Sequence, residues 1–142
     1  MPISQEELLT AEAHLYVGIA KADGIVSKNE YTQVPYYADR SKKFFEKKEK
    51  IAPVQPKLGK KIREIFNSPH YKEYDSSQHL TAASKTLQQA HNEGSWNAKL
   101  ILFRNERGFL DAAKIDGYVI KEASFIRKME ETLGAIFEYQ EE

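Results

Sequence analysis

Apolar residues return every three or four positions along most of this chain, which is the spacing of an α-helix buried along one side. No stretch shows the strict apolar–polar alternation that a half-buried β-strand requires. The pattern therefore predicts an all-α protein. The stripes are formed by Leu8, Ala11, Leu15, Ile19 and Ala22; by Leu58, Ile62, Ile65 and Phe66; by Leu80, Ala83, Leu87 and Ala90; by Leu100, Phe103 and Leu110; and by Phe125, Met129, Leu133 and Ile136.

Two short motifs mark where helices begin. Ser4 with Glu7, and Ser27 with Glu30, have the Ser-x-x-Glu spacing of a capping box, in which each side chain bonds the backbone N–H of the other residue. Gly24 lies between the two boxes and suits the left-handed conformation that commonly ends a helix. We therefore expect one helix to begin after Ser4 and to end near Gly24, and a second to begin after Ser27.

Prolines divide the central part of the chain. Pro35 is predicted to kink or restart the second helix, because proline lacks a backbone N–H and clashes with the preceding turn. The segment 53–56 is predicted to be a connector inside one domain, since too few residues lie on either side for two independent cores. The segment 67–69 ends the short helix that follows. These signals predict a compact single domain, residues 1–142, of about seven helices.

One short phrase occurs twice in the chain. Residues 16–26 read YVGIAKADGIV, and residues 109–119 read FLDAAKIDGYV. In each copy an apolar helical segment runs into Asp-Gly, and a new helical pattern follows at once. The repeat predicts two pseudo-equivalent helix–Asp-Gly–helix hairpins, each with an acidic corner. The identical pairs are Ala20 and Ala113, Lys21 and Lys114, Asp23 and Asp116, Gly24 and Gly117, and Val26 and Val119.

The second copy departs from the first just after its Asp-Gly. Ile120 replaces the capping Ser27, and Ala123 stands where the copy of Glu30 would be. The nearest carboxylate is Glu122, one residue early, and one position on a helix rotates a side chain by about 100°. The sequence spacing therefore predicts an acidic site at the second corner that differs from the first.

The first copy, residues 20–27 followed by Glu30, resembles the TerB-like tellurite-resistance family, and the weaker second copy is also similar to that family. The resemblance implies a compact all-helical domain whose two hairpins are related by a pseudo-twofold axis. It also implies a non-enzymatic bacterial stress-response module that is linked to metal or metalloid resistance and binds metal cations or partner proteins. The residues carried over are Asp23, Glu30 and Asp116, with Glu122 as the substitute at the second corner.

The first corner is a candidate site for a divalent cation. Ca²⁺ and Mg²⁺ are bound by carboxylate and carbonyl oxygens, which Asp23, Glu30 and the turn between them supply. Zn²⁺ is the third cation that we consider, and the candidate ligands are Asp23, Glu30, Asp116 and Glu122. An EF-hand is excluded, because residues 23–25 lack its alternating oxygen ligands. The competing interpretation is structural: Glu30 closes a capping box and Asp23 orders the turn.

Positive charge is concentrated in the middle of a chain that is neutral overall. Between Arg40 and Arg63 there are ten Lys or Arg residues and two acidic residues, a local net charge of +8, so the rest of the chain carries −8. This stretch could bind an acidic protein, an anionic membrane face or, through phosphate contacts and base stacking, nucleic acid. The alternative is a solvated helix face with Phe44 and Phe45 turned inward. The partner-binding candidates are Lys42, Lys43, Lys47, Lys48, Lys57, Lys60 and Lys61.

No motif in the sequence points to catalysis. The chain has no cysteine, which excludes disulfides, thiolate metal sites and cysteine nucleophiles. None of the histidines (His14, His70, His79 and His91) has a recognised ligand spacing, and His14 lies off the first apolar stripe, which predicts a surface position. There is neither a secretory signal pattern nor an apolar run long enough to span a bilayer, so we expect a cytoplasmic protein.

Overall fold

The computed structural model describes residues 3–22, 24, 26–48, 58–94, 98–115 and 120–138. Within these ranges it contains helices and no β-strand, so the all-α prediction is confirmed. No helix in these ranges combines the length and the apolar character needed to cross a bilayer. The elements are α1 (Gln5–Lys21), α2 (Lys28–Lys48), α3 (Leu58–Asn67), the 3₁₀ turn η1 (Pro69–Tyr71), α4 (Ser76–Asn92), α5 (Ala98–Ala113) and α6 (Ile120–Glu138).

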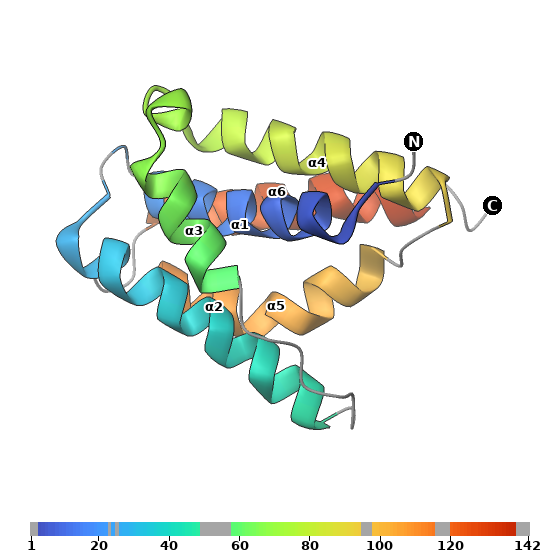
Figure 1. The fold of residues 1–142 in the computed structure, drawn as a ribbon, viewed down its shortest axis with the longest axis horizontal. Helices are drawn as coiled ribbons and strands as arrows, with labels where there is room; N and C mark the ends of the chain where they lie inside the picture. The colour runs from blue at the N-terminus through green and yellow to red at the C-terminus, as the bar shows by residue number, and fades with distance from the viewer. Residues whose placement is uncertain are drawn as a thin grey trace.

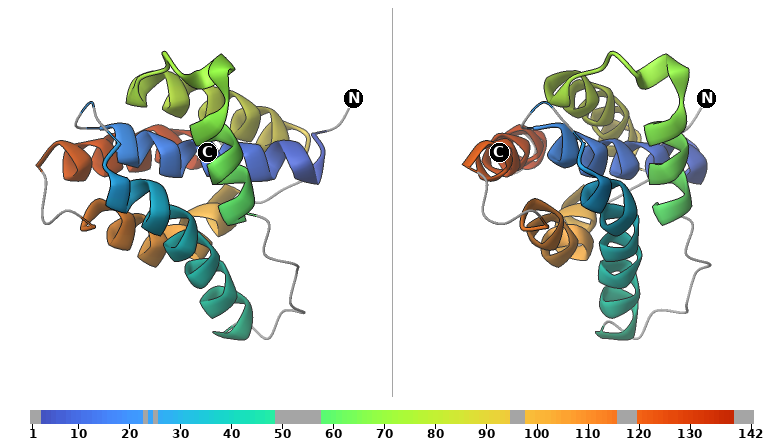
Figure 2. Two further views of the ribbon diagram at one scale, coloured as in Figure 1. Left: turned by 60° about the vertical axis from the view of Figure 1, so that its left-hand side comes forward. Right: turned by 90° about the vertical axis from the view of Figure 1, so that its left-hand side faces the viewer.

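Helix α1 is the centre of the fold and packs against each of the other five α-helices (Figure 1). In the right-hand view of Figure 2, α3, α4, α6 and the pair α2–α5 lie around it. Every residue from Ala11 to Ala20 is buried, whichever side of the helix it occupies. Most of these residues are apolar or small, and burial on every side stabilises such a helix because each face then removes apolar surface from water.

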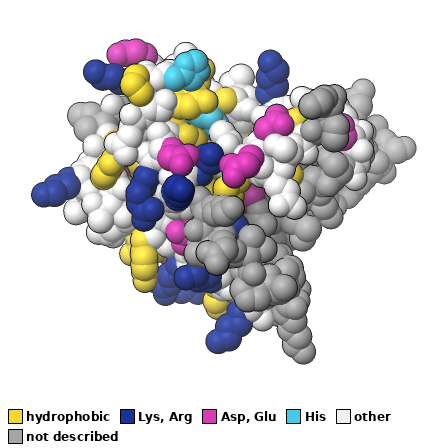
Figure 3. Space-filling model, viewed as in Figure 1, with side chains coloured by type: hydrophobic (Ala, Val, Ile, Leu, Met, Phe, Trp, Pro, Cys, Tyr) yellow, Lys and Arg dark blue, Asp and Glu magenta, His cyan; other side chains and the backbone are white. Residues whose placement is uncertain are grey.

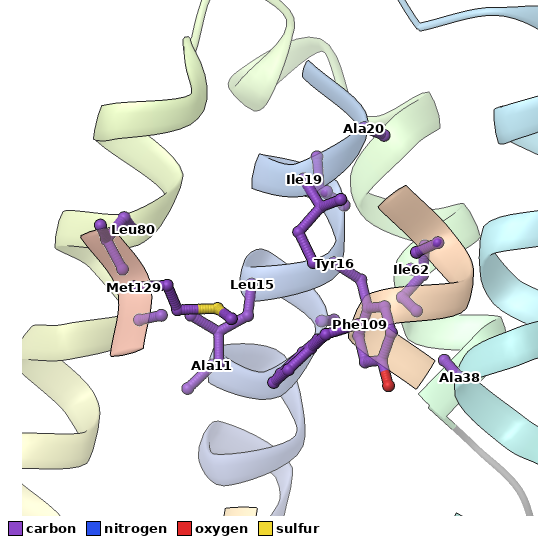
Figure 4. Packing of buried hydrophobic residues seen from close by; sticks show 14 of the residues in the cluster. Ala11, Leu15, Tyr16, Ile19, Ala20, Ala38, Ile62, Leu80, Phe109 and Met129 are labelled. Atoms are coloured by element: carbon purple, nitrogen blue, oxygen red, sulfur yellow. The ribbon is translucent and has the colours of Figure 1, made fainter. Parts of the chain in front are cut away.

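The hydrophobic core forms around α1 (Figure 4). The rings of Tyr16 and Phe109 meet with centroids 4.8 Å apart, and Leu80 and Met129 lie on the other side of α1. The predicted apolar stripes are in this core or packed against it wherever the structure describes their side chains, except at Leu110. Leu110 is 45% exposed, because α5 turns the adjacent Phe109 inward and each helical position rotates by about 100°.

The predicted helix ends are confirmed where the structure describes them. Ser4 Oγ accepts the Glu7 N–H at 3.1 Å, and Glu7 Oε1 accepts the Ser4 N–H at 3.2 Å, which completes the capping box of α1. Gly24 has a φ of +94°, the left-handed conformation expected at this corner. Helix α3 ends at Asn67, as predicted. The connector predicted at 53–56 lies outside the described residues.

The predicted count of about seven helices is not confirmed, since the described part of the chain holds six α-helices and one 3₁₀ turn. The difference lies in α2, which continues through Pro35 and does not restart there. Val34 and Ala38, on either side of Pro35, are completely buried. Burial of this face offsets the backbone hydrogen bond that proline removes, so packing overrides the local preference.

Candidate functional site

The first Asp-Gly corner joins α1 to α2. Ala22 caps α1, donating its N–H to the Ile19 carbonyl at 3.2 Å, and Gly24 donates its N–H to the Lys21 carbonyl at 2.9 Å. The chain then enters α2 through Ser27. Asp23, a predicted cation ligand, lies outside the described residues, so its role stays a prediction.

Glu30 is both a helix cap and a buried carboxylate. Its Oε1 accepts the Ser27 N–H at 3.0 Å, and its own N–H donates to Ser27 Oγ at 3.0 Å, so the predicted capping box is confirmed. Its side chain is 1% exposed, whereas Glu7 and Gln78, which hold the same position in the capping boxes of α1 and α4, are exposed. Capping therefore does not by itself require burial of this carboxylate.

Glu122, which follows the second Asp-Gly pair in the sequence, lies at the start of α6 and is 1% exposed. Glu122 is the third residue of α6, just as Glu30 is the third residue of α2. The two helices begin at different distances from their aspartates: α2 begins five positions after Asp23, and α6 begins four positions after Asp116. This difference of one position compensates for the earlier place of Glu122 in the sequence. Both glutamates thus share one helical register, and the rotation expected from the sequence spacing does not arise. Asp116 lies outside the described residues.

The cation site is only partly within the described structure. Two of the four predicted ligands, Glu30 and Glu122, are placed, each buried in the first turn of the helix that follows a corner. Among the described side chains, no three His, Asp or Glu residues come close enough to hold one metal ion. Carboxylates of this kind suit a hard cation such as Ca²⁺ or Mg²⁺ better than a soft metal.

The lysines of the basic stretch differ in exposure. Lys43, Lys47 and Lys60 are exposed, and Figure 3 shows Lys and Arg side chains gathered over α2 and α3. Lys42 is 6% exposed, so it does not contribute to an exposed basic surface. Lys61 forms two ion pairs, with its Nζ 3.2 Å from Glu6 Oε2 and 3.2 Å from Glu64 Oε2. The side chain of Lys48 and all of Lys57 lie outside the described residues.

Phe44 is not turned inward as the solvated-face interpretation expected. Phe44 is 55% exposed and Tyr36 is 59% exposed. The inward side of α2 is occupied by the smaller residues Ala38 and Ser41, which allow α1 and α5 to approach closely. The Phe45 side chain is outside the described part. An exposed basic and aromatic surface is therefore present on α2.

A buried histidine pair links α1 to α4, and the sequence patterns gave no indication of it. His14 and His79 lie with their Nδ1 atoms 2.9 Å apart, and both side chains are buried. The predicted surface position of His14 is wrong, because α1 is buried on all sides and not along one stripe. The signal in the sequence is the nearly unbroken run of small and apolar residues at 11–20, which is typical of a central helix.

The two histidines share a single proton on the line between them. One Nδ1 must donate and the other must accept, and His79 Nε2 is a buried atom without a hydrogen bond in the described structure. A buried N–H without an acceptor costs more free energy than a buried ring nitrogen without a donor, so the proton of His79 is favoured on Nδ1 and not on Nε2. His79 Nδ1 is then the donor and His14 Nδ1 the acceptor. Desolvation by burial, helped by the nearby Lys21 ammonium, lowers the pKa of His14 to about 4 and that of His79 to about 3. Both rings are therefore neutral at pH 7.

Aromatic rings and Lys21 surround this pair. Tyr71 packs edge-on against His14 with centroids 4.8 Å apart, and Tyr74 lies 5.3 Å from His79. Lys21, one of the repeated residues, donates from Nζ to the carbonyl oxygens of Tyr71 and Tyr74, each at 2.9 Å. Desolvation lowers the pKa of Lys21, against the opposing effect of Asp75 and Glu73. The contacts of the two histidines, Tyr71, Tyr74 and Lys21 hold the turn before α4 against α1.

A second buried polar network links α1 to α5. The Tyr16 hydroxyl donates to Asn105 Oδ1 at 2.8 Å, and Asn105 Nδ2 donates to Glu12 Oε2 at 3.0 Å. All three side chains are buried. Buried polar groups of this kind fix one arrangement of the helices, because other packings would leave them without hydrogen bonds.

Comparison of the chain with protein-family models, with curated proteins and with solved structures finds no match.

Proposed function

We propose that this protein is a non-enzymatic, TerB-like module whose helix-hairpin corners bind a divalent cation, with a role in stress responses of the tellurite-resistance type. One observation carries the proposal. Glu30 and Glu122 come from different ends of the chain, occupy the same position in α2 and α6, and are buried to the same degree. The Asp-Gly repeat relates the two corners in sequence, and the two buried glutamates extend that relation to the helices.

The chemistry of buried carboxylates supports a cation as the ligand. Ionised carboxylates are stable in a protein interior when a positive charge or several hydrogen bonds compensate for the lost water. A divalent cation supplies that charge and is satisfied by carboxylate and carbonyl oxygens. Asp23 and Asp116, which precede Glu30 and Glu122 by seven and six positions, are the further ligands that we propose.

The test must separate cation binding from helix capping at Glu30. Glutamine also serves as the third residue of a capping box, so Glu30→Gln preserves the cap while removing the charge. Ser27→Ala does the reverse: it weakens the cap, which costs about 1 kcal/mol of stability, and leaves the carboxylate in place. Glu7→Gln is the matched control, because it makes the same substitution in the capping box of α1.

Chelator-stripped protein is titrated with Ca²⁺, Mg²⁺ and Zn²⁺ while backbone amide NMR shifts are recorded. We expect saturable shifts at both corners, and affinity roughly tenfold weaker or more in Glu30→Gln and Glu122→Gln, since each removes a charged ligand. Ser27→Ala and Glu7→Gln should bind as the unmodified protein does. If no amide shifts on addition of the cations, or if both glutamine variants bind with unchanged affinity, the corners have only a structural role at the helix ends.

A second candidate function is that of a protein-interaction adaptor. The observation that favours it is the exposed basic and aromatic surface on α2, where Phe44 and Tyr36 face solvent among cationic side chains. Exposed aromatic side chains within a polar surround are typical of protein-binding surfaces. This function does not depend on a cation at the corners.

A further inference from the structure

One face in the C-terminal half of α2 gathers positive charge around the ring of Phe44. Arg40, Lys43, Phe44 and Lys47 are all exposed and follow the spacing i, i+3, i+4, i+7, which places them on one side of the helix. Asp39, the acidic residue beside Arg40, is turned to α3, where its Oδ1 accepts the Gly59 N–H at 2.9 Å. The C-terminal half of α2 projects beyond the other described helices (Figures 1 and 2). This face is thus accessible as well as basic.

Helix α5 extends this surface. The guanidinium carbon of Arg107 lies 5.8 Å from the centroid of the Phe44 ring, a cation–π contact, and the Arg107 side chain is 62% exposed. Arg107 Nε is also 3.9 Å from Asp111 Oδ2, a separation at which a surface ion pair is weak. We call Arg40, Lys43, Phe44, Lys47 and Arg107 the α2 basic face.

We propose that the α2 basic face docks an acidic amphipathic helix of a partner protein, with Phe44 as the apolar anchor and the surrounding cations pairing with carboxylates. The inference rests on the adaptor function above and not on cation binding at the corners. Charge complementarity identifies the partner, because four cations surround one exposed ring and the charge-reversed pattern is a helix with carboxylates around one apolar residue.

The spacing of the cations fits a helix. Arg40 and Lys47 are seven residues apart, so their Cα atoms are separated along α2 by about 10.5 Å. Carboxylates seven residues apart on a partner helix have the same separation, and an apolar residue between them would meet Phe44. The partner is therefore recognised by two glutamates or aspartates that flank a leucine or a similar side chain.

Nucleic acid and membrane fit this surface less well. Base stacking needs an open ring face, and the Arg107 guanidinium already lies over one face of Phe44. An interfacial membrane helix inserts a continuous apolar face, whereas the apolar residues of α2, such as Val34 and Ala38, are buried in the core. Both ligands remain as alternative outcomes of the test.

The probe is a fluorescein-labelled helical peptide in which two glutamates, seven positions apart, flank a leucine. Binding is followed by fluorescence anisotropy at low salt, and amide shifts of the unlabelled complex locate the site. We expect saturable binding that weakens as salt is added, with the largest shifts at the α2 basic face. A glutamine version of the peptide and a version with serine in place of leucine should both bind roughly tenfold more weakly or worse.

Matched variants assign the binding to this face. The double variant Lys43→Glu/Lys47→Glu should abolish peptide binding, whereas Lys85→Glu/Arg127→Glu, with the same charge change at exposed positions of α4 and α6, should retain most of it. Phe44→Ala should weaken binding roughly tenfold, and Leu110→Ala, which also truncates an exposed apolar side chain, should not. Glu30→Gln and added chelator should leave binding unchanged, so failure of the corner proposal would be seen separately.

Three outcomes would overturn the proposal. One is the absence of saturable binding by the unmodified protein. Another is equal loss of affinity in both double variants, since that result means a general charge effect. The last is binding of a poly-uridine RNA, or of vesicles containing phosphatidylserine, at this face and more tightly than the peptide. Circular dichroism of each variant shows whether it is folded. The amide shifts of the unmodified protein locate the peptide-binding site without the use of any variant.

Discussion

The histidine pair between α1 and α4 makes the stability of the protein dependent on pH. Histidine in the unfolded chain binds a proton with a pKa near 6.5, whereas burial lowers the pKa of His14 to about 4 and that of His79 to about 3. At a pH between the pKa of the unfolded chain and the lower pKa values of the native state, the unfolded state binds more protons than the native state. The free energy of unfolding therefore falls as the pH is lowered from about 6.5 towards 4.

We predict that this pair contributes a loss of about 2 kcal/mol between pH 7 and pH 5.5, measured by urea denaturation. The double variant His14→Leu/His79→Leu should lose less stability over the same range, since it has no ring to protonate at these sites. His70→Gln, which changes an exposed histidine, should keep the full dependence. Equal pH dependence in all three proteins would mean that the buried rings do not stay neutral.

At the level of elements, helix packing depends on a close approach at Gly108. A Cβ placed at Gly108 would overlap the Tyr16 hydroxyl and lie 2.9 Å from the Ser41 Cβ. Glycine at this position lets α5 lie against α1 and α2 at once. Gly134 in α6 is different, because a Cβ there would meet no described atom within 4 Å beyond the backbone of its own helical turn.

The two glycines provide a matched pair of alanine substitutions. We predict that Gly108→Ala lowers the free energy of unfolding by about 1–3 kcal/mol, because neighbouring groups must move. Gly134→Ala should raise it by about 0.5–1 kcal/mol, because alanine favours the helix and nothing opposes the added methyl group. Thermal unfolding of both variants measures the difference, and a stabilised Gly108→Ala would show that the helices are not in close contact there.

At the scale of the whole molecule, α1 joins every other helix into one core. The network from Tyr16 through Asn105 to Glu12 lies in this core, so damage to it should be felt by all helices together. We predict that Asn105→Leu lowers the free energy of unfolding by about 2–4 kcal/mol, because the buried Glu12 carboxylate loses a donor.

The unfolding curve should remain a single transition in this variant. Far-ultraviolet circular dichroism, which reports helices, and near-ultraviolet circular dichroism, which reports packed tyrosines, should shift to the same lower urea midpoint. Gln89→Leu is the control, since it removes an amide–carboxylate hydrogen bond of 3.1 Å to Glu93 at an exposed site and should change stability by less than about 0.5 kcal/mol. Separate transitions would show that the helices do not share one core.

The sequence by itself determined the helical class, the positions of most helix ends and the apolar faces of α3, α4 and α6. These features follow from local rules, because periodicity, capping residues and glycine act within a few residues of one another. The capping box of Ser27 and Glu30 and the left-handed Gly24 were predictable for this reason. The repeated corners were also recognisable as a repeated sequence motif.

Only the tertiary structure decided which polar residues are buried and what they touch. His14 and His79 are 65 positions apart, and Tyr16 and Asn105 are 89 apart, so no local pattern could pair them. The course of α2 through Pro35, the exposure of Phe44 and the common register of Glu30 and Glu122 likewise depend on how the helices pack around α1. Packing free energy is a property of the assembled core, and it outweighs the local preferences that a sequence displays.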